Sequence, residues 1–422
     1  MKFRMKDQMS SDEPKIPVVV LSSTTTIRFA NKQKRESIGA FVDQYTDFMQ
    51  KVVDFYWDQR DEKIPAFIPT EILKQLESPI PARAKQCAAK QALAILRGSL
   101  RKHKQREFRA NEMHENGEFK KERKLREIIE SKKVAKPNVS GGSIEIDSRF
   151  LKHSTREENG TTFDEWVVFS SGDKNFISLP VRYNRHYNRL VEQGYKRLNG
   201  IRISKKSITF LFEKQVEAKT DSKTLGIDIG YKKLLCDSSG VKSETDNHGH
   251  TMESIIKRLS RKKRGSKAFQ RTVALRKNYI GWCLNQLNLE DYSTIRIEKI
   301  RKLRLGKRTS RLLSHWDYKD IFDRIKLHCS KQGVLVKEVN PTYTSQRCSL
   351  CGWTRKRNRN GERFKCSSCG FEHDADLNAA VNISLDLPAI SKAKRLQRIN
   401  MKGFYWFAVG QAPIVPAVQQ TS

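Results

Sequence analysis

Two Cys-x-x-Cys pairs near the C-terminus constrain the fold of this chain more than any other feature. Cys348 and Cys351 form the first pair, Cys366 and Cys369 form the second, and a glycine follows each pair. Two tight turns of this kind present four thiolates, which satisfy the tetrahedral coordination of Zn²⁺. Fourteen residues separate the pairs, just under the usual spacing of such sites, and four ordinary thiols are the alternative. We therefore predict a zinc ribbon over residues 341–371.

The charge of the chain indicates a polyanionic partner. The 422 residues include 82 lysines and arginines against 47 acids, a net charge of +35. Such an excess opposes compaction unless a polyanion neutralises it, and nucleic acid is the obvious polyanion. An anionic membrane is the alternative, but no lipid-anchor motif is present. No run approaches the roughly 18 apolar residues of a membrane span.

The other four cysteines do not suggest a disulfide framework. Cys87, Cys236, Cys283 and Cys329 are scattered, mostly among apolar residues. This usage suits a reducing cytoplasm better than secretion. The first residues also lack the apolar core of a signal peptide, so we expect a cytoplasmic protein.

The first 136 residues combine one strand pattern with long helical patterns. β-Branched residues in the segment 17–30 predict a strand. After Ser37, the expected N-cap, apolar residues recur every three or four positions and predict a helix with one buried face. A second helix is expected from Ala82. Residues 83–136 contain 17 basic residues against 7 glutamates, so we expect a phosphate-facing surface there rather than only a solvated helix face.

Short strands dominate the next segment. They are expected at residues 144–150, 166–169, 176–181, 201–203 and 208–212, with Asn-Gly turns among them and a helix over 184–197. We interpret these strands as a small β-barrel that the strand 17–30 joins. Residues 31–136 would then be a helical lobe inserted into the barrel.

From residue 224 the expected elements follow the order of an RNase H-like domain. They are a strand at 224–229, hairpin partners at 234–237 and from 241, a strand at 294–300, a helix at 316–332, a strand at 334–339 and, after the ribbon, a helix that includes Asp376. In that fold, acids on the first strand, the fourth strand and the last helix converge. Here those acids are Asp228, Glu298 and Asp376.

Each of these acids has an ordinary explanation when taken alone. Asp228 lies in an apolar strand, where a charge is costly unless it is paired, and an arginine could pair it. Glu298 has the same anomaly, and Asp376 could merely complement a helix dipole. Together they predict a site for two Mg²⁺ ions, since Mg²⁺ prefers carboxylate oxygens. Asp374 is a competitor for Asp376, but side chains two apart on a helix diverge, and we choose Asp376.

Four motifs in combination resemble a known family. They are Gly-Ile-Asp-Ile-Gly around Asp228, the strand that ends at Glu298, Tyr-Thr-Ser-Gln-x-Cys-x-x-Cys-Gly, and Asp-Ala-Asp-x-Asn-Ala-Ala-x-Asn-Ile around Asp376. Over residues 224–384 the chain is similar to TnpB, the RNA-guided nuclease of bacterial insertion sequences, and to the miniature type V CRISPR effectors.

The resemblance implies a function and a site. The split RuvC triad of the family falls on Asp228, Glu298 and Asp376, which would hold catalytic Mg²⁺, and the structural zinc ligands fall on the four ribbon cysteines. A guide RNA and a target DNA would be the partners, bound by a monomer or by a homodimer on one RNA. The family is bacterial or archaeal, so a nucleoid-associated cytoplasmic protein is expected. The usual Pro-Thr-x-x-Gln after the first strand is replaced by Ala30-Asn31-Lys32-Gln33, which leaves TnpB and CRISPR effector as open alternatives.

The predicted architecture is α+β and multidomain. Its parts are a flexible N-terminus (1–16), a wedge β-barrel (17–30 and 137–218), a helical recognition lobe (31–136), a RuvC-like nuclease domain (219–340 and 372–390), the zinc ribbon (341–371) and a C-terminal tail (391–422). The function expected from this architecture is Mg²⁺-dependent, RNA-guided cleavage of DNA. The alternatives are a guide-dependent DNA-binding protein without cleavage and a transposase.

Overall fold

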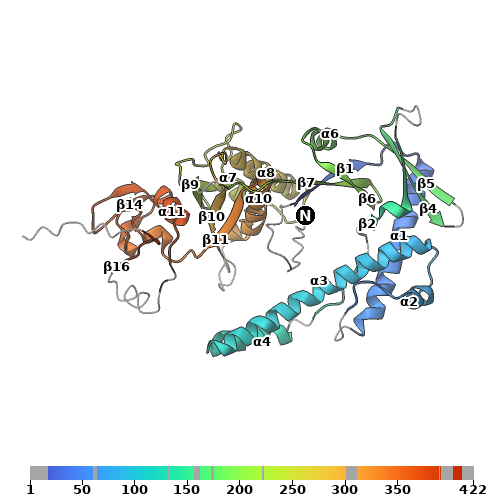
Figure 1. Cartoon of the computed structure of the whole chain (residues 1–422), viewed down its shortest axis with the longest axis horizontal. Coiled ribbons are helices and arrows are strands. Elements are labelled where there is room, and N and C mark those ends of the chain that lie inside the picture. The colour runs from blue at the N-terminus through green and yellow to red at the C-terminus, as the bar shows by residue number, and fades with distance from the viewer. Residues whose placement is uncertain are drawn as a thin grey trace, which may run out of the picture. The chain divides into compact units, whose positions relative to one another are not determined.

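The computed structural model describes residues 18–59, 64–131, 134–139, 141–155, 162–172, 175–220, 223–300, 311–388, 390 and 403–410. The predicted flexible N-terminus and most of the predicted tail lie outside these residues. The chain divides into two compact units, one formed mainly by residues 20–214 and one mainly by residues 215–422. Both contain helices and strands, which confirms the mixed α/β composition (Figure 1). None of the described helices is long and apolar enough to cross a membrane.

Seven strands of the first unit form two sheets. One sheet has the order β1 (Val18–Thr26), β7 (Ser207–Gln215), β6 (Lys196–Ser204), β2 (Ile144–Ile146), and the other has β3 (Leu151–Thr155), β4 (Glu165–Gly172), β5 (Asn175–Val181). The strand predicted over 144–150 is interrupted, because a 3₁₀ turn covers Ser148–Phe150. Barrel closure of these sheets stays a prediction.

Four helices are described between β1 and β2. They are α1 (Lys32–Trp57), α2 (Thr70–Gln75), α3 (Ala82–Glu115) and α4 (Phe119–Ser131), and α4 packs along the long α3 (Figure 1). Helix α1 buries the apolar stripe predicted for it. It begins five residues before Ser37, because the Asn31 side chain accepts the Lys34 N–H at 2.8 Å and caps it. The Ser37 hydroxyl instead donates to the Gln33 carbonyl inside the helix.

The helix predicted over 184–197 is shorter than expected. Asn184 caps α6 (Arg185–Glu192) by accepting the Tyr187 N–H. Gly194 adopts a left-handed conformation with φ 76°, which ends the helix, and β6 starts at Lys196. The pattern of apolar residues continues past Gly194 and conceals this break.

A buried ion pair connects the two sheets of the first unit. The Glu165 side chain on β4 is 1% exposed, and Arg197 on β6 donates to both of its carboxylate oxygens, at 2.8 and 2.9 Å. The Tyr183 hydroxyl and the His153 ring also contact this carboxylate. Burial would raise the pKa of Glu165, but these partners outweigh it and lower the pKa to about 2.

The second unit contains a four-stranded sheet with the order β11 (Leu335–Val339), β10 (Thr294–Glu298), β8 (Thr224–Ile229), β9 (Leu235–Asp237). Strands β8, β10 and β11 are parallel, and β9 runs antiparallel to β8. The second predicted hairpin partner is reduced to a single bridge between Lys242 and Cys236. The helices described in this unit are α7 (Met252–Ser260), α8 (Lys267–Asn285), α9 (Arg311–Ser314), α10 (Tyr318–Ser330) and α11 (Ala375–Ser384).

Helix α11 packs directly on β8, and a glycine makes this possible. A Cβ atom on Gly226 would lie 2.0 Å from the Ala380 carbonyl oxygen and 2.4 Å from the Ser384 nitrogen. Only a residue without a side chain fits there. Because side chains two apart on a strand share a face, Asp228 lies on the same side of the sheet as α11.

The segment between β11 and α11 is a small β structure. It contains β12 (Trp353–Thr354), β13 (Arg359–Asn360), β14 (Arg363–Lys365) and β15 (Glu372–Asp374), and the last three form one antiparallel sheet. Strand β12 pairs with β16 (Phe404–Tyr405), which comes from the predicted tail.

Candidate functional site

The four predicted zinc ligands meet in the small β structure. Their sulfur atoms all lie within 4.8 Å of one another, with 3.6 Å between Cys351 and Cys366 and 3.8 Å between Cys348 and Cys369. A tetrahedral Zn²⁺ with bonds of about 2.3 Å requires sulfur–sulfur distances of about 3.8 Å. The cluster therefore fits the predicted structural zinc.

The glycine after each pair shapes the turn that presents the thiols. Gly352 and Gly370 have φ values of 77° and 74°, which favour glycine. Their N–H groups donate to the carbonyls of Cys348 and Cys366, at 3.0 and 3.1 Å. The two turns are thus built alike, as the sequence predicts.

The acids Asp228 and Glu298 lie on adjacent parallel strands. Ile227 pairs with Ile297 in the register of β8 and β10, so the acid after each isoleucine lies at the same level of the sheet. Burial and, after it, the nearby charges of Glu298 and Asp376 together raise the pKa of Asp228 to about 7. Burial also raises the pKa of Glu298. Glu298 and Asp376 therefore both lie close enough to Asp228 to affect its pKa.

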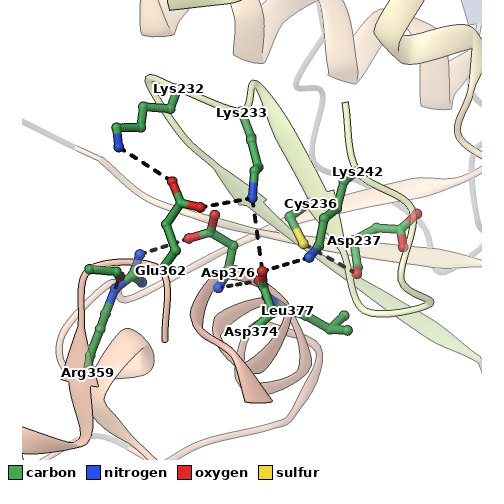
Figure 2. Close-up of polar contacts among 11 residues, drawn as sticks. Lys232, Lys233, Cys236, Asp237, Lys242, Arg359, Glu362, Asp374, Asp376 and Leu377 are labelled. Carbon is green, nitrogen blue, oxygen red and sulfur yellow. Dashed lines mark hydrogen bonds and ion pairs between the residues drawn. The ribbon is translucent and has the colours of Figure 1, made fainter. Parts of the chain in front are cut away.

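The acids are less tightly grouped than the thiols. Among the described residues, only the four cysteines bring three or more potential metal-ligand atoms within 4.8 Å of one another. Two residues from the ribbon contact the acids. The Thr344 hydroxyl donates to the Glu298 carboxylate, and Arg359 Nη2 donates to Asp376 Oδ1 at 2.8 Å (Figure 2). Arg359 also partly offsets the rise in the pKa of Asp228.

Asp374 has a different set of partners from Asp376. Its carboxylate caps α11 by accepting the N–H groups of Asp376 and Leu377, both at 3.0 Å, and it forms an ion pair with Lys242 Nζ at 2.8 Å (Figure 2). Partial burial opposes the effect, but the Lys242 contact and the backbone donors lower the pKa of Asp374. The charge of Asp374 is thus compensated locally, and Asp376 stays our candidate ligand.

A buried arginine links the first cysteine turn to α11. Arg347 is fully buried, and it donates from Nη1 to Asn382 Oδ1 and from Nε to the Trp406 carbonyl, both at 2.6 Å. Asn382 in turn donates to the Thr344 carbonyl at 3.0 Å, and Asn378 donates to the Arg347 carbonyl at 2.8 Å. The two asparagines of the Asn-Ala-Ala-x-Asn motif therefore fix the ribbon against the helix that carries Asp376.

Residues 403–410, which we call the C-terminal strap, complete the ribbon. Besides the β16–β12 pairing, the Trp406 N–H donates to the Gly352 carbonyl at 2.9 Å, and its indole N–H donates to the Pro388 carbonyl at 3.1 Å. The Tyr405 hydroxyl lies 2.8 Å from the Ser368 hydroxyl, in the second cysteine turn. Sequence reasoning assigned no role to this segment.

Comparisons with known proteins agree with the resemblance. Residues 318–383 match the family model "Cas12f1-like, TNB domain". The CRISPR-associated endodeoxyribonuclease Cas12f1 of Sulfoacidibacillus thermotolerans is 36% identical over 146 residues, 34% of this chain and 33% of that protein. A TnpB-like protein of Methanocaldococcus jannaschii is 25% identical over 274 residues, 57% of this chain and 97% of that protein.

The matched part is thus about a third of the length of that Cas12f1 relative. This chain also aligns with a chain of a solved structure described as a Cas12f1–sgRNA–target DNA complex. The alignment has a TM-score of 0.47 and 14% sequence identity, and it covers 83% of this chain and 81% of the chain in that structure.

Proposed function

The chain is a relative of the TnpB-like proteins and the Cas12f1 endodeoxyribonucleases, and we propose that it is an RNA-guided DNA endonuclease. The observation that carries the proposal is the shared environment of Asp228, Glu298 and Asp376, in which burial and then the charges of the other two acids raise the pKa of Asp228. Strongly perturbed carboxyl groups that influence one another mark functional sites more often than structural ones.

We assign the second unit to the RuvC-like nuclease domain. Its three parallel strands with an antiparallel β9 at the edge, and α11 packed on β8, support this assignment. We likewise assign the two sheets of the first unit to the wedge domain and the helices between β1 and β2 to the recognition lobe, which the order of these elements along the chain supports.

The residues of the acidic site fit divalent cations. Burial and the charges of Glu298 and Asp376 disfavour ionisation of Asp228, which a bound cation would favour, and hard oxygen ligands suit Mg²⁺. When bound, two such ions would activate a water and stabilise the leaving oxygen of a phosphodiester. Asp228 and Glu298 would hold the ions from the sheet, and Asp376 from α11.

The ribbon residues orient these ligands. The Thr344 hydroxyl donates to one oxygen of Glu298 and leaves the other oxygen to a ligand. Arg359 holds Asp376 through one oxygen and limits the charge that accumulates before metal binds. The zinc ribbon thereby acts as a scaffold for the acidic site.

The nucleic-acid partners follow from charge and family. A net charge of +35 favours a polyanionic partner. In this family the guide RNA supplies sequence specificity by base pairing, and the protein reads a short flanking DNA motif. The affinity of the chain for RNA should fall steeply with salt, because binding releases counterions.

Cleavage of a guide-matched DNA in Mg²⁺, measured beside a gel-shift assay of binding, tests the proposal. Asp228→Ala should abolish cleavage and leave binding nearly intact, and Glu298→Gln and Asp376→Asn should behave in the same way. The losses should not add, because the three acids act as one unit. Undiminished cutting by Asp228→Ala would overturn the nuclease assignment. A wild-type protein that binds the target without cutting it would favour the non-cleaving alternative.

A further inference from the structure

Three aromatic rings and three basic side chains gather at one end of the β3–β4–β5 sheet in the first unit, where β4 begins and β5 ends. The ring centroids of Phe29 and Phe163 lie 5.7 Å apart, and those of Phe163 and Trp166 lie 5.6 Å apart. The basic members are Arg28, Lys34 and Arg182. We call these six residues the aromatic–basic cluster.

Each basic member lies over a ring. The guanidinium carbons of Arg28 and Arg182 lie 4.8 and 5.5 Å from the Phe29 centroid, and Lys34 Nζ lies 4.7 Å from the ring of Trp166. These are distances of cation–π contacts. The members come from the turn after β1, the first turn of α1, the start of β4 with the residues before it, and the residue after β5, so the fold brings them together.

The cluster lies at the surface and does not belong to the core. Glu165 and Val167 on β4 are buried, so Trp166 between them points to the opposite, outward face of the sheet. Phe29, Arg28 and Arg182 are exposed, and Phe163 and Trp166 are half-buried.

The three cations are not neutralised within the described part of the chain. No carboxylate described there lies within ion-pair distance of any of them, whereas other surface cations are paired, such as Lys205 with Asp43. The neighbouring acid, Asp164, accepts the Tyr183 N–H at 2.8 Å. The cluster therefore presents flat apolar rings within a patch of uncompensated positive charge.

We propose that the aromatic–basic cluster binds unpaired nucleotides, with bases stacked on its rings and phosphates held by Arg28, Arg182 and Lys34. Every base has a flat face that stacks on aromatic side chains and on guanidinium planes, but a duplex hides these faces. An acidic peptide would match the charge and leave the rings unused. The inference rests on the proposed function for its source of nucleotides, which is either the guide RNA or a DNA strand opened during targeting.

A binding titration at several salt concentrations tests the proposal. The probes are a labelled single-stranded RNA of the guide sequence, a single-stranded DNA of the same sequence and a blunt DNA duplex. The full-length variants are Phe29→Ala with Trp166→Ala, and Arg28→Ala with Arg182→Ala. The matched control is Phe176→Ala, which removes a ring that is 62% exposed on the outward face of β5 and has no described cation over it.

The ring variant should bind a single strand at least roughly 10-fold more weakly, since it loses two aromatic side chains on which bases can stack. The arginine variant should also reduce the salt slope by about 1 per lost phosphate contact. Duplex binding should not change, and Phe29→Tyr with Trp166→Phe should restore single-strand affinity. Loss in the RNA arm identifies the guide as the source, and loss only in the DNA arm identifies the opened strand.

The proposal is overturned if the ring variant weakens neither single strand more than Phe176→Ala does, or if it weakens the duplex equally. This outcome differs from failure of the nuclease assignment, because Asp228→Ala leaves the cluster intact. That protein should bind single strands as the wild type does, whatever its cleavage activity.

Discussion

Replacing Asp228 by asparagine should stabilise the protein while it removes activity. The folded structure raises the pKa of Asp228 from its usual 3.8 to about 7. This difference corresponds to roughly 4 kcal/mol of unfavourable free energy for the charged form above pH 7. The amide has the same shape without the charge but must still satisfy its hydrogen bonds, so we expect the free energy of unfolding to rise by about 2–4 kcal/mol.

The stabilisation by Asp228→Asn should be larger at high pH than at low pH. Between pH 3.8 and 7 the folded protein binds the Asp228 proton more tightly than the unfolded chain does, so stability falls as the pH rises through this window. The benefit of Asp228→Asn should therefore be complete at pH 8 and less than half of that at pH 5.

Thermal unfolding in Mg²⁺-free buffer at pH 5 and pH 8 measures this effect. No chelator is added, so that the zinc stays in place. For a unit of this size, each 1 kcal/mol moves the melting temperature by roughly 2–4 °C. Mg²⁺ should stabilise the wild type and not the variant, because a ligand of the folded state adds stability only where it binds.

Asp374→Ala is the opposing control, which should lower the melting temperature, since losing a helix cap costs about 1 kcal/mol. A variant that melts at or below the wild-type temperature at pH 8 would refute the account of the acidic site.

Four further predictions follow from other parts of the structure. In guided cleavage assays, Asp376→Asn should abolish cutting, whereas Asp374→Asn keeps the cap acceptor and should be much milder; equal losses would contradict the choice between the two acids. Elemental analysis should find about one zinc per chain, and none in Cys348→Ser. Trp406→Ala removes a buried anchor of the ribbon and should cost about 3–5 kcal/mol of stability and speed zinc loss to a colorimetric chelator. Glu165→Gln should destabilise the first unit by about 3–5 kcal/mol because Arg197 stays buried without its partner. In the wild type, the ionised Glu165 stabilises the first unit fully above pH 4.5. This contribution should disappear as the pH falls toward 2, which urea unfolding at several pH values can measure.

Residues whose chemical type is required by their role could be predicted from the sequence. Zinc requires thiolates at fixed spacing, and Cys348 and its three partners do meet in space. Burying a lone charged acid in an apolar strand is energetically unfavourable, and for this reason Asp228 could be identified from the sequence as a candidate functional residue. The structure adds that α11 can approach that strand only because residue 226 is glycine.

Contacts between distant basic residues and their partners could not be predicted. In a chain with 82 lysines and arginines, nothing local distinguishes Arg359, which contacts Asp376, or Arg347, which reaches the Trp406 carbonyl 59 residues further along the chain. Thr344 lay within a quoted motif, but its contact with Glu298 depends on how the ribbon folds back. Helix ends were missed for local reasons. The Asn31 cap starts α1 before its apolar pattern begins, and the left-handed Gly194 ends α6 inside a pattern that continues.

The C-terminal strap also affects when during synthesis the acidic site can be completed. Domains generally fold as units while the chain is being made, N-terminal parts first. Among the described elements, β16 is translated last, after all four cysteines and all three acids. Until Phe404 and Trp406 leave the ribosome, the first cysteine turn lacks its partner strand and Arg347 lacks the carbonyl that receives its Nε–H. A nascent or prematurely terminated chain would therefore carry Asp228, Glu298 and Asp376 without the finished ribbon, so we expect assembly of the proposed site to wait until this segment has been made.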